Sequence, residues 1–501
     1  MATYQRPGVY VEETLNPIAP VVGANSTSVA AFVGASDRGP LVPTLVTSWS
    51  QYVNTFGGWN SKNSNSNDLP LAVFSFFSNG GSSAYIQRAI GAGAGTASVD
   101  LPDALSAPAL TVTAVNPGSW GTDIAVAVSN VLDIDDNPAD PNWVYDLTIF
   151  YKGVTSAYSV ERYQGVSNDP TSNRFVENVV NSAYVTVSAV TTTHPDSTGA
   201  TPINLTGSSL DGAVVTESTI AAAVDGLDVL NNSLILNAAG VTTSTYVNQV
   251  IAYAEGRQDV FVVIDPIGAD AAAQLTAVAS YTASALAASY YPKVTIPDPT
   301  VNTAGATKTI SPSGAVIGLY ALTDTARGVF KAPAGMTARL GGVVAVPALT
   351  NAELDAMNSA ASPVNAIRYI PGTGFSVMGA RTLKPGYADR YIPVRRSLIY
   401  LRKALTDLTQ FAIFEPNDQT LWKRLNDTCS NFLTDFWQQG GLRGANASQA
   451  FFVKCDSENN TVASIDAGEV NIEIGVALQR PAEFVIIKIG QYEGGTTVSV
   501  A

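Results

Sequence analysis

Two changes of residue pattern divide this chain of 501 residues into segments of different character. Up to about residue 90, buried-strand patterns such as Val29–Gly34 alternate with helix-like stretches such as Leu71–Phe77. The segment Gly91–Gly95 is typical of a flexible joint. From about 96 to 206 the chain is rich in Thr, Val, Ser and Asn, and polar and apolar residues alternate, which predicts short strands. From 208 to about 375 the α/β pattern returns.

We therefore predict a multidomain α/β fold, in which a small β-barrel or sandwich is inserted into an α/β core and an α+β domain follows. The hydrophobic share of 46% is large enough for several cores. The expected boundaries are an extended arm at 1–20, a first core segment at 21–92, the inserted β domain at 96–206, a second core segment at 208–375, the C-terminal domain at 376–480 and a terminal arm at 481–501.

The last quarter of the chain has the clearest helix pattern. One helix is predicted over Val394–Phe411, and a second begins at an Asn417 cap and carries Cys429 on its apolar stripe. Two strands are predicted next, Gln449–Cys455 and Glu469–Val476, and the alternation in the second gives it one buried face. Cys429 is therefore interpreted as a small core residue.

The residue inventory argues against an enzyme. His194 is the only histidine and lies in a polar loop, and no phosphate-binding loop or nucleophile elbow occurs. Asp265 follows the buried strand Val260–Ile264 and precedes an Ala-rich helix expected over Ala269–Ala288, so we interpret it as a helix-capping or loop residue. We predict no catalytic, cofactor or metal site.

Neither the two cysteines nor a cluster of four aspartates predicts a metal site. Cys429 and Cys455 are too few for a disulfide scaffold, lack metal-ligand spacing and are expected to be reduced. Asp133, Asp135, Asp136 and Asp140 suggest calcium, but the loop lacks the glycine and the bidentate glutamate of a calcium loop. A solvated hairpin loop is the favoured interpretation.

The charge is uneven along the chain. Residues 376–501 hold 13 Lys and Arg and 13 Asp and Glu, so the whole net charge of −14 lies in residues 1–375. An acidic exterior argues against direct nucleic-acid binding. No run of 18 apolar residues occurs, so we expect no membrane insertion. The N-terminus does not resemble a secretion signal, so we expect the protein to assemble in the cytoplasm.

The chain begins and ends with a β-prone segment set off by proline. Pro7 precedes Val9–Glu12, and Pro481 precedes Phe484–Ile489. Either these segments fold back into their own subunit's sheet, or each pairs with the open sheet edge of a neighbouring subunit. Exchange between subunits would build a propagating polymer.

Short segments in a fixed order carry a family resemblance. Those segments are Pro7–Glu13, Val33–Pro40, Asn79–Gly81 with Tyr85 and Arg88, Pro117–Gly121, Gly328–Gly335, Asn365–Arg368, Gly379–Leu383, Arg395–Arg396, Phe414–Asn417 with Trp422, Gly440–Gly444, Ala450–Val453 and Pro481–Phe484. With them the chain resembles the tail sheath proteins of contractile bacteriophages, pyocins and related contractile injection systems.

The resemblance implies a subtilisin-like but non-catalytic core over 208–375, an outward-facing β domain, and a C-terminal assembly domain. It implies a sheath subunit that polymerises helically around an inner tail tube and contracts to drive the tube through a cell envelope. Exchanged strands would link the subunits. The implied arm residues are Val9, Tyr10, Val11, Glu12, Phe484, Val485, Ile486 and Ile487, and the implied acceptor residues are Phe451, Phe452, Val453, Ile472 and Ile474.

A basic stretch from 381 to 403 holds seven Lys and Arg against one Asp. It is either a solvated helix face with intersubunit salt bridges or a surface that grips an acidic tube. The candidate tube-facing residues are Arg390, Arg395, Arg396, Arg402 and Lys403.

The resemblance also implies partners and a location. We expect a homo-oligomer of stacked hexameric rings in a virion tail, with an inner tube protein, a baseplate and a tail terminator as partners and no cofactor. Energy for contraction would be stored in subunit packing, without nucleotide hydrolysis. The alternatives are a secreted surface-layer-like protein, which would need a secretion signal or anchor, and a catalytically dead relative of α/β hydrolases.

Overall fold

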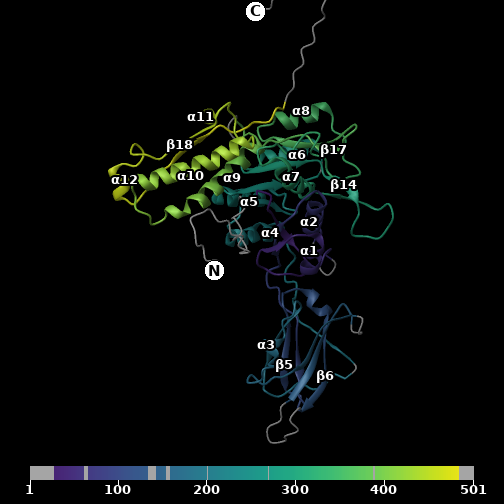
Figure 1. Cartoon of the computed structure of the whole chain (residues 1–501). Helices are drawn as coiled ribbons and strands as arrows, with labels where there is room; N and C mark the ends of the chain where they lie inside the picture. Colours follow the sequence, from purple (N-terminus) through teal and green to yellow (C-terminus); the bar gives the residue numbers. More distant parts are fainter. Residues whose placement is uncertain are drawn as a thin grey trace, which may run out of the picture.

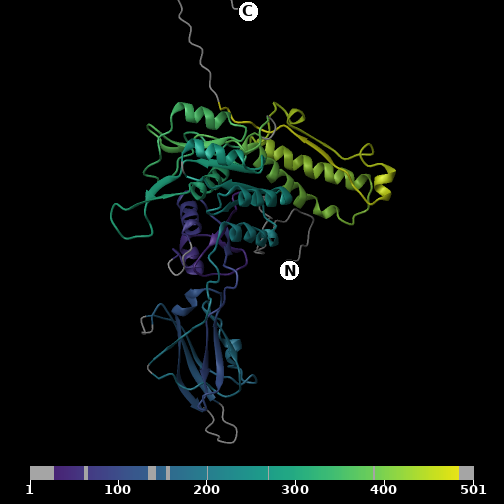
Figure 2. The same cartoon turned by 180° about the vertical axis from the view of Figure 1, so that it is seen from behind.

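The computed structural model describes residues 27–60, 66–133, 143–153, 158–199, 201–268, 270–386 and 390–483. These residues form three parts (Figure 1). A central α/β body carries a β unit that projects from one end, and a C-terminal lobe rich in helix extends to the side. The view from behind shows the same division, with the β unit joined to the body by a narrow neck (Figure 2).

The body is built on an eight-stranded mixed sheet. Its six central strands are parallel, and an antiparallel strand closes each edge. The central strands are almost wholly buried and apolar, as expected for a parallel sheet covered on both faces. In sheet order the strands are β17 (Gly374–Val377), β16 (Val364–Ile370), β13 (Ala287–Tyr291), β12 (Val260–Ile264), β11 (Leu234–Ala238), β1 (Ala30–Ala35), β3 (Ala84–Ala89) and β2 (Thr44–Val46).

Helices cover the two faces of this sheet. From β1 the chain continues to β3 on one side of the sheet, whereas from β11 it continues to β12 and β13 on the other side. Right-handed crossovers therefore place α2 on one face and α5 and α6 on the other. Helix α7 packs beside α2, and α8 packs beside α6. The helices are α1 (Trp49–Phe56), α2 (Asp68–Ser78), α4 (Glu217–Ala223), α5 (Ser244–Arg257), α6 (Ala271–Ala279), α7 (Ser313–Arg327) and α8 (Asn351–Ser359), and the hairpin β14 (Val294–Pro297) and β15 (Thr307–Ile310) lies outside the main sheet.

The Ala-rich helix expected over Ala269–Ala288 is wrong at its C-terminal end. Helix α6 ends at Ala279, and Ala287 and Ala288 begin strand β13 between β12 and β16. Alanine favours helix only weakly, and burial between two strands overrides that preference.

The projecting β unit contains two antiparallel sheets that share one hydrophobic cluster, with Trp120 and Tyr145 as its largest members. One sheet has three strands and the other four. The strands are β4 (Ser98–Pro102), β5 (Pro108–Ala114) and β9 (Val185–Ala189) in the first, and β10 (Ile203–Asn204), β6 (Ile124–Asp133), β7 (Trp143–Tyr151) and β8 (Ser159–Val166) in the second; the short helix α3 (Val176–Val179) packs against β9. Of the acidic loop, Asp133 ends β6, and Asp135, Asp136 and Asp140 lie outside the described residues.

Hydrogen bonds hold the neck between the body and the β unit at Gly91–Gly95, the segment predicted to be a flexible joint. Ala213 N donates to the carbonyl of Ala92, and Gly95 N donates to that of Ser209. The backbone of Ala213 lies so close to Gly91 that a side chain there would overlap it. Glycine therefore serves close approach of two chain segments here.

Two arginines of the body complete the neck. The Arg88 guanidinium donates to the carbonyls of Ser36, Asp37, Gly39 and Pro117 at 2.9–3.2 Å. Arg38 lies among three aromatic rings of the β unit, with its guanidinium carbon 5.7 Å from the Trp120 centroid, 5.0 Å from that of Tyr151 and 5.5 Å from that of Tyr184. Cation–π attraction and buried hydrogen bonds thus fix the β unit to the body.

The C-terminal lobe packs two long helices on a small sheet. Asp418, and not Asn417, caps the second helix by accepting from Leu421 N; the Asn417 side chain binds the indole N–H of Trp422 instead. Cys429 is buried on the apolar stripe, as predicted, and burial raises the pKa of its thiol. The elements are α9 (Ile392–Thr409), α10 (Gln419–Gln438), α11 (Ala447–Ala450), β18 (Phe451–Lys454), α12 (Val462–Asp466) and β19 (Glu473–Val476). Across the described ranges, no helix is long and apolar enough to span a bilayer.

Candidate assembly surface

The two-stranded sheet of the C-terminal lobe is the candidate assembly surface. Strands β18 and β19 pair antiparallel, from Phe451 opposite Val476 to Lys454 opposite Glu473. Phe451 and Val453 on β18 and Ile474 and Val476 on β19 face α10 and join its hydrophobic cluster. Within the described part of the chain, neither strand pairs with a further strand, so each has an outer edge without a partner strand, although the carbonyl of Val453 already accepts from Asn426 Nδ2 of α10.

The outward face of this sheet carries an exposed aromatic side chain. Phe452 is 53% exposed. It lies opposite Gly475, where a side chain would overlap the Phe452 ring. The Phe452 ring therefore leaves apolar surface exposed on this face of the sheet. The side chains of a further strand, added at the edge, would pack against it.

The expected strand Glu469–Val476 is observed only in its second half. The backbone before it is already used by side chains, because Asn417 Nδ2 donates to the carbonyl of Glu469 and Asn471 N donates to Asn460 Oδ1. Four of the proposed acceptor residues therefore lie on the sheet, and Ile472 lies beside it in a separate apolar cluster with Trp422.

The residues proposed as arms, Val9, Tyr10, Val11 and Glu12 together with Phe484, Val485, Ile486 and Ile487, lie outside the described residues. The described chain begins at Thr27 and ends at Glu483. Each of these two residues is bound by one arginine of the C-terminal domain.

Arg381 binds the C-terminal end of the described chain. Its Nε donates to Glu483 Oε1 at 2.9 Å and its Nη2 to Glu483 Oε2 at 2.5 Å. The Tyr391 hydroxyl also donates to Glu483, and Arg381 Nη1 donates to the carbonyl of Asn358. The hydrogen bonds to Glu483 raise the pKa of Arg381.

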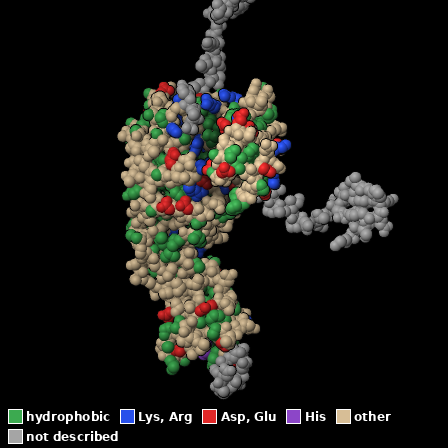
Figure 3. All heavy atoms as spheres, turned by 90° about the vertical axis from the view of Figure 1, so that its left-hand side faces the viewer, with side chains coloured by type: hydrophobic (Ala, Val, Ile, Leu, Met, Phe, Trp, Pro, Cys, Tyr) green, Lys and Arg blue, Asp and Glu red, His purple; other side chains and the backbone are tan. Residues whose placement is uncertain are grey.

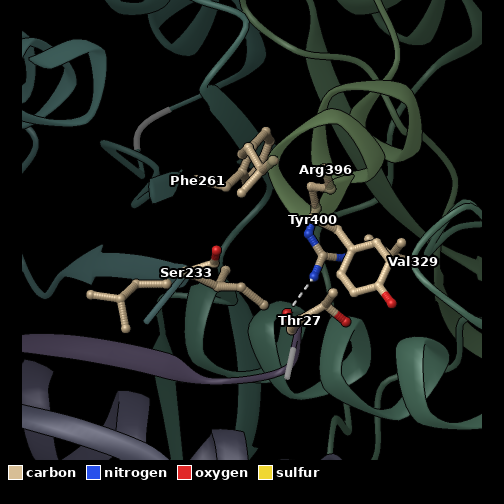
Figure 4. A pocket seen from close by; sticks show the side chains of 9 residues that line it. Thr27, Ser233, Phe261, Val329, Arg396 and Tyr400 are labelled. Atoms are coloured by element: carbon tan, nitrogen blue, oxygen red, sulfur yellow. Dashed lines mark hydrogen bonds between the residues drawn. The ribbon is translucent and has the colours of Figure 1, made fainter. Parts of the chain in front are cut away.

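Arg396 binds the N-terminal end of the described chain. Its Nη2 donates to the carbonyl of Thr27 at 2.9 Å, across a small cavity lined also by Ser233, Val329 and Tyr400 (Figure 4). The same guanidinium donates to both carboxylate oxygens of Asp324 on α7, at 2.9 and 2.5 Å. Arg396 and Asp324 are 4% and 3% exposed, so this ion pair is buried.

The aromatic surroundings of Arg396 extend into the body. Its guanidinium carbon lies 4.7 Å from the centroid of Tyr320, whose hydroxyl is hydrogen-bonded to that of Tyr290. Helix α9, helix α7 and strand β13 are therefore joined by one buried polar network.

This network corrects the assignment of Arg396 as a tube-facing residue, because its charge is enclosed and already paired. Of the other candidates, Arg402 is exposed, Lys403 pairs with Asp407 at 2.9 Å, and Arg395 donates to Gln258 at 2.9 Å. Arg390 is partly exposed at the start of α9. Contact of these four residues with a tube stays a prediction.

Asp265 is a loop residue, one of the two interpretations made from the sequence, and it does not cap α6. Asp270 caps α6, whereas Asp265 is buried at the C-terminal end of β12 and accepts from Asn237 Nδ2, Ser311 Oγ and Gly240 N at 2.7–2.9 Å. Burial raises the pKa of this carboxyl. Its oxygens are occupied by the protein's own donors. His194 lies in the β unit with its ring 4.3 Å from that of Trp143, far along the chain from Asp265.

The whole-chain fold matches sheath proteins of contractile machines. The chain is similar to the sheath of an extracellular contractile injection system (PVC) in its contracted state, with 23% identity, 98% of this chain and 99% of that chain covered, and a TM-score of 0.59. It is similar to the contracted helical sheath of the anti-feeding prophage, with 24% identity, 98% and 100% coverage and a TM-score of 0.58. A sheath tail protein from Listeria innocua gives 13% identity, 91% and 96% coverage and a TM-score of 0.60. At these identities the likeness defines the fold class, a mixed α/β multidomain sheath fold.

Sequence comparison points to the same family. The phage tail sheath C-terminal domain model matches residues 388–491. The tail sheath protein of Vibrio phage KVP40 is 29% identical over 179 residues, which are 35% of this chain and 25% of that protein. Residues 388–491 thus match the phage tail sheath C-terminal domain, and the resemblance to contractile tail sheath proteins is confirmed.

Proposed function

We propose that this chain is the structural subunit of a contractile tail sheath. Copies polymerise as a helical stack of hexameric rings around an inner tail tube, between a baseplate and a tail terminator. Contraction drives the tube through a cell envelope. The subunit acts in a virion tail that is assembled in the host cytoplasm, and it performs no catalysis.

The observation that carries this proposal is the β18–β19 sheet. It lies within the segment that matches the sheath C-terminal domain, and both of its outer edges lack a partner strand in the described chain. The β-prone segments Val9–Glu12 and Phe484–Ile489 lie beyond Thr27 and Glu483, which are held to the body and the C-terminal lobe. Exchange of these segments would complete the sheet of a neighbouring copy by β-augmentation.

Contraction in this proposal releases energy stored in subunit packing. The extended polymer is metastable, and the strand exchange keeps neighbouring copies connected while they rearrange. The candidate tube contacts are made by Arg390, Arg395, Arg402 and Lys403. Because solvent and salt screen such contacts, they can be broken together on contraction.

Electron microscopy of the purified full chain tests the proposal. We expect tubes or rings from the full chain and none from a variant that lacks residues 1–13. Val11→Pro, which removes a backbone donor, should weaken assembly, whereas Val11→Ala should retain it. Uniform monomers from the full chain, with and without a tube protein as template, would refute a sheath.

A further inference from the structure

The turn between α9 and α10 places an aromatic residue where the backbone favours glycine. The carbonyl of Ala412 accepts from Glu415 N at 3.2 Å, Ile413 has φ −67° and ψ 123°, and Phe414 has φ 66°. These angles define a type II turn, whose third residue has a positive φ and is ordinarily Gly or Asn. A bulky side chain at this position strains the backbone, so another interaction must offset the cost.

Packing within the same subunit does not offset it. The side chain of Phe414 is fully exposed, and that of Ile413 is 66% exposed. Glu415, which follows, is exposed as well. We call residues 413–415 the Phe414 turn. It presents two apolar side chains and a carboxylate to a partner, and a strained aromatic residue that its own subunit leaves uncovered is typical of a binding contact.

A basic cleft lies at the opposite end of the C-terminal lobe, where the lobe meets the body. It has a volume of about 880 Å³ and is bounded by the end of α7, by α8, by β16 and by residues 479–483. The name basic cleft refers here to the space between Arg327, Lys331, Arg368 and Arg480. On the face drawn in Figure 3, Lys and Arg side chains gather along a hollow in the upper half of the molecule.

The positive charge of the basic cleft is not balanced by its own carboxylates. Asp355 and Glu483 are the acidic residues in its lining, and Glu483 is already held by Arg381. Among the described residues, none of the four cations forms a salt bridge. Burial, and then the charge of Arg327, lower the pKa of Lys331. A carboxylate from outside would therefore be attracted to this cleft.

The walls of the basic cleft also offer apolar surface. Phe330, Leu354 and Met378 line it beside the cations. The Nε atom of Arg368 is buried and has no hydrogen-bond partner among the described residues. A buried donor without a partner is costly, so an acceptor supplied from outside would stabilise it. The cleft thus fits an aromatic ring next to a carboxylate.

We propose that the Phe414 turn of one copy of this chain binds in the basic cleft of a second copy. The Phe414 ring packs against the apolar wall, and the Glu415 carboxylate lies among the cations. The inference rests on the proposed function, because the polymer is what brings copies together. The contact leaves the edges of β18 and β19 to the terminal segments.

A copy cannot fill its own basic cleft. Phe414 precedes α10, whereas Gly440, which lines the cleft, follows it. The 20 residues of α10 hold its two ends about 30 Å apart. The two surfaces of the contact are therefore different patches at opposite ends of the lobe. Such a contact is heterologous, and it continues from copy to copy until it closes a ring or forms a helix.

Zero-length carbodiimide cross-linking of the full chain tests the proposal, because it joins a carboxylate to a contacting amine. We expect a link between Glu415 and Lys331. In an equal mixture of ¹⁵N-labelled and unlabelled chains, the link should also join labelled to unlabelled peptides. It should disappear in Lys331→Glu and in Glu415→Lys, and it should return in the double variant Lys331→Glu/Glu415→Lys, where amine and carboxylate have changed places.

Electron microscopy of the same samples, with and without a tube protein as template, separates this contact from the sheath proposal. Tubes of the parent chain that lack the link would refute the contact and leave the sheath proposal standing. Links found only within single copies would refute the contact in the same way. Chains that never assemble would refute the sheath proposal, and the contact with it.

Phe414→Asn distinguishes a contact residue from a residue that serves its own fold. Asparagine tolerates a positive φ, so the variant should unfold at the same or a higher denaturant concentration than the parent. The protein concentration needed for tubes should rise about tenfold or more, because buried aromatic side chains dominate interface energies. Leu105→Asn, at an exposed apolar residue of the β unit, should leave that concentration unchanged. Unchanged assembly of the Phe414→Asn variant, or a loss of its folded stability, would overturn the proposal.

Discussion

The guanidinium of Arg381 and the carboxylate of Glu483 form a two-point ion pair, with Nε to Oε1 at 2.9 Å and Nη2 to Oε2 at 2.5 Å. Both side chains are largely buried, and the two residues are 102 positions apart. Parallel hydrogen bonds of this kind fix direction as well as distance. The pair therefore sets where the terminal segment leaves the lobe.

Arg381→Met should release residues 479–483 from the body. We expect a loss of about 1–3 kcal/mol in the free energy of unfolding, because among the described residues Glu483 then keeps only the Tyr391 hydroxyl as a donor. Amide hydrogen exchange in 477–483 should accelerate, while exchange in β12 stays unchanged. Lys423→Met, at an exposed pair on α10, is the matched control. Unaltered exchange in 477–483 would contradict the anchoring role.

Arg396→Met should be more damaging, since it leaves the Asp324 carboxylate buried without its ion partner. The expected loss is about 3–5 kcal/mol, measured by denaturant unfolding. The double variant Arg396→Met/Asp324→Leu should recover part of that loss, because no charge then stays buried. Additive losses in the double variant would show that the two residues act independently.

The sequence pattern located the apolar elements well. Strand β12 has the predicted bounds Val260–Ile264, and α2 contains the predicted helical stretch Leu71–Phe77. The alternation that predicted β19 was misleading before Glu473, where Asn417 and Asn460 bind the backbone. These bonds join residues that a local pattern cannot relate, because 52 and 11 positions separate the partners.

The sequence did not predict which arginines of the basic stretch 381–403 are buried and paired. Arg395 and Arg396 are adjacent and identical in type, yet one is half-buried beside Gln258 and the other is enclosed with Asp324. The partner of Arg396 lies 72 positions away on α7, so only the packing of α9 on α7 distinguishes the two residues. The cleft lined by Arg327, Arg368 and Arg480 likewise arises from segments that the chain brings together only when folded.

Arg38→Met should loosen the neck without unfolding the body or the β unit. The cation among the rings of Trp120, Tyr151 and Tyr184 is lost, which removes about 1–2 kcal/mol of attraction. Pulsed electron paramagnetic resonance between labels at Thr192→Cys and Thr276→Cys should give a narrow distance distribution for the parent and a broader one for the variant. Equal widths would contradict the role of Arg38.

Acid should weaken the β unit through Asp146. Burial raises the pKa of this carboxyl, but hydrogen bonds from Arg162, Asn130 and Gly165 outweigh burial, so its pKa lies below the ordinary value of 3.8. A depressed folded-state pKa gives stability that is present above pH 3.8 and is lost as the pH falls through the folded value. Asp146→Asn should be less stable than the parent at pH 7 and should lose less stability on acidification. Parallel unfolding curves from pH 7 to pH 2 would refute this.

Reversal of charge at the exposed Arg402 tests the tube contact. Arg402→Glu should reduce co-assembly with an acidic tube protein, more strongly at low salt than at high salt, because exposed charges are screened. Co-sedimentation of sheath and tube measures the effect, and Lys423→Glu on α10 is the control. Co-assembly that is unchanged at every salt concentration would remove Arg402 from the tube-facing set.

The contacts of Arg38 and Arg88 across the neck couple the β unit to the body. We therefore expect a rotation of the body to move the β unit with it, and the displacement grows with distance from the rotation axis toward the distal end (Figure 1). His194 lies against Trp143 at the start of β7, and the neighbouring Thr192 is exposed. A dye at Thr192 would therefore convert a small turn of each subunit into a measurable change of fluorescence polarisation.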